Sequence, residues 1–371
     1  MPPASATPSN VRASTTVGPA SAGGAPLALT MGEPAGIGGE IALKAWFARD
    51  PERLPPFFLI DDPDRLAALA RRLALAVPIK AIAGPEDARG AFRSALPVLP
   101  EPLPKAVEPG RPDPANGRAV LRSIERAVEL VQAGRAAAVV TNPIHKASLY
   151  RGGFAHAGHT EFLAALAKVA TPPVMMLACD ALRVVPVTIH VSLIESIRSL
   201  TTEAIVAKSA ITAKALARDF GIRAPRLAVA GLNPHAGEGS RLGTEEETVI
   251  RPAIEHLTER GIDVSGPWPP DTMFAPAARE SYDAAICMYH DQALIPIKTI
   301  AFDEAVNLTL GLPFVRTSPD HGTAFDIAGR GTARPASLIA ALRMAARMAA
   351  MRARVDMNSG AGAAAFTGDG I

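Results

Sequence analysis

Three of the eight histidines, His190, His235 and His290, stand at or just past the end of an apolar run. A full strand-helix unit separates each from the next, which excludes a short finger-type zinc motif. The ends of parallel strands meet at one edge of a sheet, so the three imidazoles can converge on one divalent ion there, with open positions left for substrate oxygens. Alternatively, each is a separate strand-end histidine without a shared centre, and the spacing alone leaves both interpretations open.

Charged and amide side chains follow His290 within one short stretch. Asp291 is next to it, and Lys298, Asn307 and Arg316 supply an amine, an amide and a guanidinium. Such side chains bind phosphates and carboxylates, so the stretch predicts a site for a metal together with a phosphorylated or carboxylated small molecule. We regard Lys298 and Asp291 as the candidate catalytic residues: Lys298 can bind an anion or act as a base, and Asp291 can orient a histidine ligand or cap a helix.

A further candidate site lies at His159 and Thr160. These residues follow the glycine-rich segment RGGFAHAG and open the predicted helix EFLAALAKV. The backbone N–H groups at a helix N-terminus favour an anion, which suits a substrate contact. The alternative is an ordinary helix cap with a surface histidine beside it.

The elements that must position these residues alternate between strands and helices. Apolar runs at 27–31, 57–61, 77–83 and 284–288 are typical of buried strands, and amphipathic segments such as 116–133 predict helices between them. This alternation predicts an α/β protein with a mostly parallel, doubly wound sheet. We expect the proline-rich segments 95–114 and 264–274 to be surface loops.

Composition narrows the classes of function. The formal net charge of the 371-residue chain is +2, so nothing indicates nucleic acid or a membrane surface as a partner. No apolar run is long enough to cross a bilayer. Cys179 and Cys287 lie in apolar runs and are expected to be reduced core residues, which favours a cytoplasmic location. We expect residues 1–26 to form a disordered leader and 358–371 a flexible tail.

Five segments resemble the signature segments of the 4-hydroxythreonine-4-phosphate dehydrogenase family of pyridoxine biosynthesis. They are GHTEFL, LNPHAGEGSRLGTEE, PPDTMF, MYHDQALIPIK and LPFVRTSPDHGTAFDIAG. The resemblance runs from about Leu27 to about Arg352. It implies a two-domain α/β/α fold like that of isocitrate and isopropylmalate dehydrogenases, with one domain formed by 27–140 and about 300–357, and the other by about 141–299.

The resemblance also implies a site, cofactors and an assembly. It implies NAD or NADP, bound without the usual dinucleotide glycine pattern, and one divalent metal (Zn, Mg or Co) per subunit. It implies a homodimer whose active site lies at the subunit interface, with metal ligands from both chains. The residues it assigns are His190, His235 and His290 to the metal, and His159, Thr160, Lys298, Asn307 and Arg316 to the substrate.

The reaction implied by the resemblance is oxidation of 4-phosphooxy-L-threonine at its C3 hydroxyl, followed by loss of CO₂ to give 3-amino-2-oxopropyl phosphate. Oxidation of a sugar-acid phosphate, such as D-threonate or D-erythronate 4-phosphate, is the nearest alternative. A metallohydrolase with three histidine ligands is a more distant one, because it would need a metal-bound water and no nicotinamide.

Overall fold

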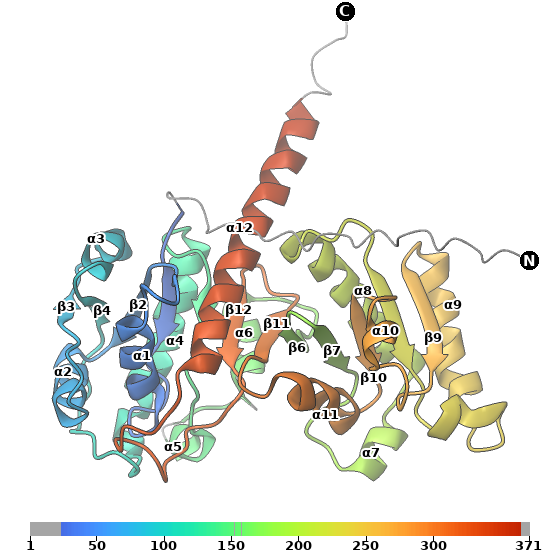
Figure 1. Ribbon diagram of the computed structural model, residues 1–371, viewed down its shortest axis with the longest axis horizontal. Helices are drawn as coiled ribbons and strands as arrows, with labels where there is room; N and C mark the ends of the chain where they lie inside the picture. Colours follow the sequence, from blue (N-terminus) through green and yellow to red (C-terminus); the bar gives the residue numbers. More distant parts are fainter. Residues whose placement is uncertain (1–23, 152, 157, 365–371) are drawn as a thin grey trace, which may run out of the picture.

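The computed structural model of the protein describes residues 24–151, 153–156 and 158–364. Within these residues, one 12-stranded sheet runs through the molecule in the order β3-β4-β2-β1-β5-β12-β11-β6-β7-β10-β8-β9. Helices cover both of its faces, and the long helix α12 (Ala336–Ala364) crosses the middle of one face and continues beyond the body of the protein (Figure 1). The expected α/β architecture with a mostly parallel sheet is confirmed.

The sheet consists of two parallel halves that run in opposite directions. The first half contains β1 (Leu27–Thr30), β2 (Phe57–Asp61), β3 (Ile79–Ala81), β4 (Leu96–Pro100), β5 (Val139–Val140) and β12 (Arg316–Pro319). The second contains β7 (Leu182–Pro186), β8 (Arg226–Ala230), β9 (Asp263–Trp268) and β10 (Ala284–Cys287). Antiparallel pairing reverses the direction between the halves: β11 (Val306–Leu310) pairs with β12 and with β6 (Val174–Cys179), and β6 pairs with β7.

The two faces of the sheet are covered differently. On one face a single apolar cluster extends beneath α1 (Gly38–Phe47), α2 (Pro63–Arg72), α8 (Thr202–Asp219), α9 (Arg251–Glu259) and α12. On the other face there are two clusters. One lies under α3 (Ala88–Phe92), α4 (Gly117–Gln132), α5 (Lys146–Arg151) and α6 (His159–Ala167), and the other under α11 (His290–Ala301). The central strands between these two clusters therefore have polar side chains on that face. The domain boundaries themselves stay a prediction.

Short elements complete the described chain. They are α7 (Leu193–Arg198), α10 (Pro276–Arg279), the 3₁₀ turns η1 (Pro85–Asp87), η2 (Pro114–Asn116) and η3 (Pro234–Glu238), and the π-helical turn η4 (Glu246–Ile250).

The structure corrects our expectation that the segment 95–114 is entirely a surface loop. Residues Leu96–Pro100 form β4, which lies between β3 and β2 inside the sheet. We expected a loop because proline cannot donate to a strand ladder and is rare in interior strands. Here Pro97 and Pro100 are the second and last residues of a short strand. The two backbone N–H groups that proline lacks are therefore missing near the ends of the strand. At its first residue, Leu96 N still donates to Pro78 O at 2.8 Å.

The expectation of a loop at 264–274 is also partly wrong, because its first residues belong to the edge strand β9. An edge strand needs a ladder on one side only, which is why it tolerates Pro267. The strand is joined to the site-bearing loop after β8, where Gly231 N donates to Trp268 O at 2.8 Å.

Cys179 and Cys287 are free and buried, as expected. Across the described ranges, no helix has both the length and the apolar character that a membrane span requires. Of the expected disordered leader, residues 1–23 lie outside the described residues, as do 365–371 of the expected tail. The helix α12 extends to Ala364, beyond residue 358 where we expected the tail to begin.

Candidate active site

The alternation of side chains along the central strands creates a polar patch on the face opposite α12. Val306, Leu308 and Leu310 of β11 belong to the apolar cluster beneath α12. Successive residues of a strand point to opposite faces, so Asn307 and Thr309 face the other way. Thr317 in β12 donates to Ala341 O of α12 at 2.9 Å, which likewise turns its neighbour Arg316 to the opposite face. Asn307, Thr309 and Arg316 thus share one face between the two separate apolar clusters.

Arg316 is a buried cation that forms no ion pair with a carboxylate of the described residues. Its side chain is only 4% exposed, and burial lowers the pKa of the guanidinium to about 10. Nη1 donates to Thr309 Oγ1 at 2.9 Å and Nη2 donates to Thr141 Oγ1 at 2.6 Å. Its remaining N–H groups have no hydrogen-bond partner in the described part of the chain, and Nε among them is buried. A buried charge held in place only by neutral hydroxyls is stabilised when an anion binds to it.

His159 lies beside Arg316 at the first residue of α6. Its Nε2 is buried and has no hydrogen-bond partner within residues 24–151, 153–156 and 158–364. Burial, followed by the charges of Arg316 and Lys146, lowers the pKa of His159 well below its usual value, so the imidazole is neutral near pH 7. Thr160 follows in the same first turn, and the N-cap residue Gly158 provides no side-chain cap. The two predicted substrate residues on α6 thus open a helix whose N-terminus is available to an anion.

The three predicted metal ligands follow three neighbouring strands. His190 comes after β7, His235 lies in η3 after β8, and His290 begins α11 after β10. These strands are parallel and adjacent in the order β7-β10-β8, so the histidines leave the same edge of the sheet. The rings of His190 and His290 are close, with centroids 6.2 Å apart.

Two of the three candidate ligands have a strained backbone. His190 has a φ of 57° and His235 has a φ of 53°, which are uncommon values for residues other than glycine. Residues with such dihedral angles cluster at functional sites. The loop of His235 is fixed by Glu246, whose Oε1 accepts from Leu232 N at 2.8 Å and from Asn233 N at 2.7 Å.

Within one chain the histidines do not form a complete metal site. Over the described ranges, no group of three or more His, Cys, Asp or Glu side chains is arranged to hold an ion. The rings of His190 and His290 are close to each other at a tilt of 44°, whereas no contact joins His235 to either of them among the residues that the structure describes. Within the described residues of one chain, the three rings therefore do not share one centre.

The acidic residues beside the site have identifiable partners. Asp291 Oδ1 lies 2.7 Å from Nδ1 of His290 and so fixes its ring orientation. Lys298, two turns further along α11, forms an ion pair with Asp320 just after β12, with 2.9 Å between Nζ and Oδ2. This contact brings α11 to the end of the strand that carries Arg316.

Three residues of the site were not singled out from the sequence. Thr141 and Thr309 hold Arg316. Burial is the main cause that lowers the pKa of both His159 and His190, and the charge of Lys146 at the start of α5 adds to it. Threonine is common in strands, and a lone lysine is common on surfaces, so neither residue type indicates a site. The signal available was the position of Thr141 and Lys146 just after a buried apolar run.

A second group of unpartnered polar atoms surrounds the glycine loop between β1 and α1. The side chain of Asn142 packs against Gly32 and Gly38, and its Oδ1 is buried without a partner. Ile37 N donates to Thr323 O at 3.0 Å, and a Cβ at Gly36 would approach the same oxygen to 2.9 Å. Nearby in sequence, His321 has a buried Nε2 without a partner. The loop, β5 and the segment after β12 therefore meet around unsatisfied polar groups.

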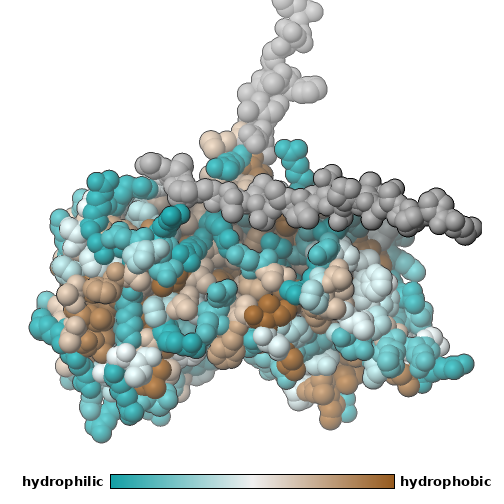
Figure 2. Space-filling model, viewed as in Figure 1, coloured by the Kyte–Doolittle hydropathy of each residue, from teal (hydrophilic) through white to brown (hydrophobic). Residues whose placement is uncertain are grey.

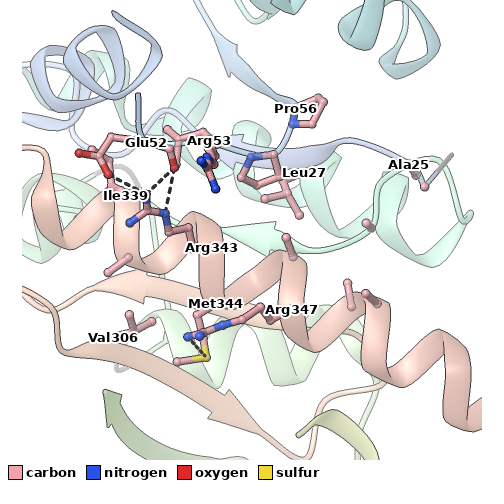
Figure 3. A pocket seen from close by; sticks show the side chains of 18 of the residues that line it. Ala25, Leu27, Glu52, Arg53, Pro56, Val306, Ile339, Arg343, Met344 and Arg347 are labelled. Carbon is pink, nitrogen blue, oxygen red and sulfur yellow. Dashed lines mark hydrogen bonds and ion pairs between the residues drawn. The ribbon is translucent and has the colours of Figure 1, made fainter. Parts of the chain in front are cut away.

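A large cavity of 1230 Å³ lies elsewhere, between α12 and the start of β1. Figure 3 shows its arginines and apolar side chains, including Arg343, which contacts Glu52. None of the predicted site residues lines it. The cavity is therefore not part of the candidate active site. That site consists of the polar patch of Asn307, Thr309 and Arg316 and the histidines near it.

The comparisons with known proteins show the family to which the chain belongs. The family model described as pyridoxal phosphate biosynthetic protein PdxA matches residues 53–345. The chain belongs to this family. The expected family resemblance is confirmed.

Relatives in the PdxA family are similar over almost their whole length. A protein from Bradyrhizobium diazoefficiens is 57% identical over 88% of this chain and 98% of its own, and one from Xanthobacter autotrophicus is 53% identical over 91% and 97%. Both are named 4-hydroxythreonine-4-phosphate dehydrogenase. The crystal structure of the protein with this name from Klebsiella pneumoniae has a TM-score of 0.80 and 37% identity, covering 88% of this chain and 99% of that chain.

A protein with a different name has a related structure. Terephthalate 1,2-cis-dihydrodiol dehydrogenase from Burkholderia xenovorans has a TM-score of 0.59 and 29% identity, covering 87% of this chain and 98% of that chain.

Proposed function

We propose that this chain is an NAD- or NADP-dependent dehydrogenase that oxidises 4-phosphooxy-L-threonine at its C3 hydroxyl. Loss of CO₂ from the resulting β-keto acid then yields 3-amino-2-oxopropyl phosphate for vitamin B6 biosynthesis. The observation that supports this most strongly is the buried Arg316, which has no carboxylate partner among the described residues and lies beside the neutral imidazole of His159. The buried reduced cysteines favour a cytoplasmic location.

In this proposal the phosphate binds to Arg316 and to the start of α6. The guanidinium has N–H groups free to donate, and His159 supplies a neutral ring whose Nε2 lacks a partner. Asn307 lies on the same strand face and can donate to the substrate. Lys298, whose Nζ forms an ion pair with Asp320, binds an anionic oxygen of the substrate. It could act as the base only if the bound substrate displaced Asp320.

The donor set suits one divalent ion. Because Asp291 is within hydrogen-bond distance of Nδ1 of His290, the lone pair of Nε2 is available to a metal, the usual arrangement for a ligand histidine. His190 and His290 of one chain, with His235 contributed across a subunit boundary, would hold the ion. When bound, the ion would polarise the C3 hydroxyl and lower its pKa.

Residues around the glycine loop would hold the nicotinamide cofactor. Asn142 Oδ1 and His321 Nε2 are unsatisfied acceptor or donor atoms, and the absence of a side chain at Gly36 leaves the backbone accessible. Backbone groups at the start of α1 suit a phosphate. When bound, the cofactor would accept the hydride from C3.

Assembly into a homodimer would complete the site. Helix α7 follows His190 directly and exposes Leu193 at 58% and Ile194 at 63%. Figure 2 shows a hydrophobic patch on this part of the surface. A contiguous exposed apolar patch is typical of a protein-protein interface, and this one lies beside an incomplete metal site.

The proposal can be tested with the purified full-length protein. We expect reduced nicotinamide to appear on addition of 4-phosphooxy-L-threonine with NAD or NADP, and a chelator to abolish its formation until a divalent metal is restored. Parallel reactions with D-threonate and D-erythronate 4-phosphate test the sugar-acid alternative. Release of inorganic phosphate without cofactor would favour a hydrolase and overturn the proposal.

A further inference from the structure

The side chain of Gln292 joins the ends of two neighbouring strands. Gln292 is the third residue of α11, the position from which a glutamine side chain reaches back over the start of a helix. Its Oε1 accepts from Met288 N, just after β10, at 2.6 Å, and its Nε2 donates to Gly231 O, just after β8, at 2.7 Å. The residue is only 7% exposed. Both ends of a buried carboxamide are thus used, each by the backbone that follows a different strand.

This bridge lies where β10 and β8 separate. The last paired positions of the two strands are Ile286 and Val229, two residues before Met288 and Gly231. A carboxamide offers one acceptor and one donor side, as a peptide unit does. Gln292 therefore occupies the place that a further peptide unit would fill between the diverging strands.

On the other side of β10 the backbone itself holds the strands together. Thr188 N and Thr188 Oγ1 both donate to Met288 O, at 3.2 Å and 2.8 Å, so β7 and β10 stay joined until two residues before each of their histidines. On the β8 side, the bond to Gly231 O is the one hydrogen bond, within the described residues, between the start of α11 and the loop that carries His235. The placement of that loop relative to β10 therefore depends on one side chain.

Close packing connects Gly231 to His235. A Cβ at Gly231 would lie 2.8 Å from Ala236 Cα, so the loop folds back directly onto this glycine. Ala236 N donates to Asn233 O at 3.1 Å, which closes the turn. Because His235 immediately precedes Ala236, the backbone that carries its ring is fixed relative to Gly231.

We propose that Gln292 is a positioning residue of the metal site, whose carboxamide fixes the loop of His235 relative to the start of α11. It acts through the backbone and not by contact with the ion or the substrate, as groups that support metal ligands from outside the coordination sphere do. The inference rests on the proposed function, because it requires the three histidines to be ligands of one ion. It holds whether His235 serves its own chain or a partner, since in either case the bridge determines where the ring leaves the sheet.

Two substitutions of Gln292 test this role. Gln292→Met removes both hydrogen bonds while keeping the length of the side chain. Gln292→Glu keeps the acceptor for Met288 N, so the start of α11 stays bonded, but it loses the donor to Gly231 O. If Gln292→Met does not fold, Gln292→Glu carries the test.

Ser123→Ala is the matched control. Ser123 is buried, and its Oγ likewise accepts from one backbone N–H, that of Met31 at 2.9 Å, and donates to one backbone carbonyl, Ile60 O at 2.7 Å. This bridge joins β1 and β2 in the other half of the sheet, away from the histidines. Its loss also leaves two buried backbone groups without a partner, so it reports the effect of general destabilisation.

Zinc affinity of the full-length protein, without substrate or nicotinamide, is measured by competition with a chromophoric chelator. The visible absorption of the cobalt-saturated protein reports the coordination geometry, and urea unfolding of the metal-free protein reports stability. We expect both Gln292 variants to bind zinc about tenfold to a hundredfold more weakly and to change the cobalt absorption. Ser123→Ala should lower the stability while leaving the zinc affinity and the cobalt absorption unchanged.

The outcomes separate the possible failures. If His290→Ala abolishes zinc binding but the Gln292 variants bind zinc as tightly as the parent protein, the role of Gln292 is wrong while the proposed function stands. An equal loss of zinc affinity in Ser123→Ala would also overturn that role, because destabilisation alone would then be the cause. If the parent protein binds no zinc, or His290→Ala binds it as tightly, the proposed metal site fails, and the role of Gln292 fails with it.

Discussion

Replacing Arg316 with methionine should cost substrate affinity without costing stability. The guanidinium is buried, and its hydrogen-bond partners among the described residues are the hydroxyls of Thr141 and Thr309. Removing a buried charge that lacks a counter-ion relieves a desolvation penalty, and this offsets the two hydrogen bonds that are lost. We therefore expect the free energy of unfolding without ligand to change by less than about 1 kcal/mol.

The effect of the same substitution on binding should be large. Two charge-assisted hydrogen bonds from Arg316 to a phosphate contribute about 1.5 kcal/mol each, or about 3 kcal/mol together. This corresponds to a dissociation constant about a hundredfold higher. Calorimetric titration with 4-phosphooxy-L-threonine measures the binding, and urea unfolding of the ligand-free protein measures the stability.

Arg352→Met provides the matched control. Arg352 Nε and Nη2 donate to the two carboxylate oxygens of Asp219 at 2.7 Å and 2.8 Å, and Asp219 is buried. Loss of this arginine leaves a buried carboxylate unpaired, so we expect a destabilisation of about 3 kcal/mol with unchanged binding. If Arg316→Met is as destabilising as Arg352→Met and binds substrate normally, Arg316 is structural and the phosphate assignment is refuted.

Three further substitutions test the metal site, the electrostatics and the assembly. Asp291→Asn should weaken metal affinity about tenfold to a hundredfold because His290 loses its orienting partner, measured by competition with a chromophoric chelator; unchanged affinity would contradict this. The depressed pKa of His159 means that the unfolded state binds more protons below about pH 6.5, so stability should fall by up to about 1.4 kcal/mol per pH unit as the pH drops below that value. Urea unfolding should find a shallower decline in His159→Gln, and parallel curves would exclude this cause. Ile194→Asp should convert a dimer to a monomer and abolish turnover, measured by light scattering and activity; a fully active monomer would rule out an interfacial site.

Much of the site could be predicted from the sequence because strand ends determine where side chains gather. His190 and His290 each follow a buried apolar run, and the parallel order of β7 and β10 brings their rings together. The strands were recognisable by their apolar runs, except where proline obscured them. β4 contains two prolines whose missing donors fall near the ends of the strand, which local sequence patterns do not reveal.

The residues that were missed depend on tertiary contacts. Thr141 and Thr309 belong to different strands, and only the pairing of the central strands brings their hydroxyls to Arg316. Lys146 and His159 lie on different helices, α5 and α6, and only the packing of these helices brings the charge of Lys146 near the ring of His159. His235 shows the limit of the strand-end argument, since its strand is adjacent to β10 but its loop does not bring the ring to His190 within one chain.

The most direct test of the account is a crystal structure of the zinc-loaded protein with anomalous scattering at the zinc edge. We predict one zinc peak per subunit, with ring nitrogens of His190 and His290 from one chain and His235 from a neighbouring chain at about 2.1 Å from it. An assembly in which these three rings share no ion, or a zinc ion bound away from them, would contradict the proposed active site.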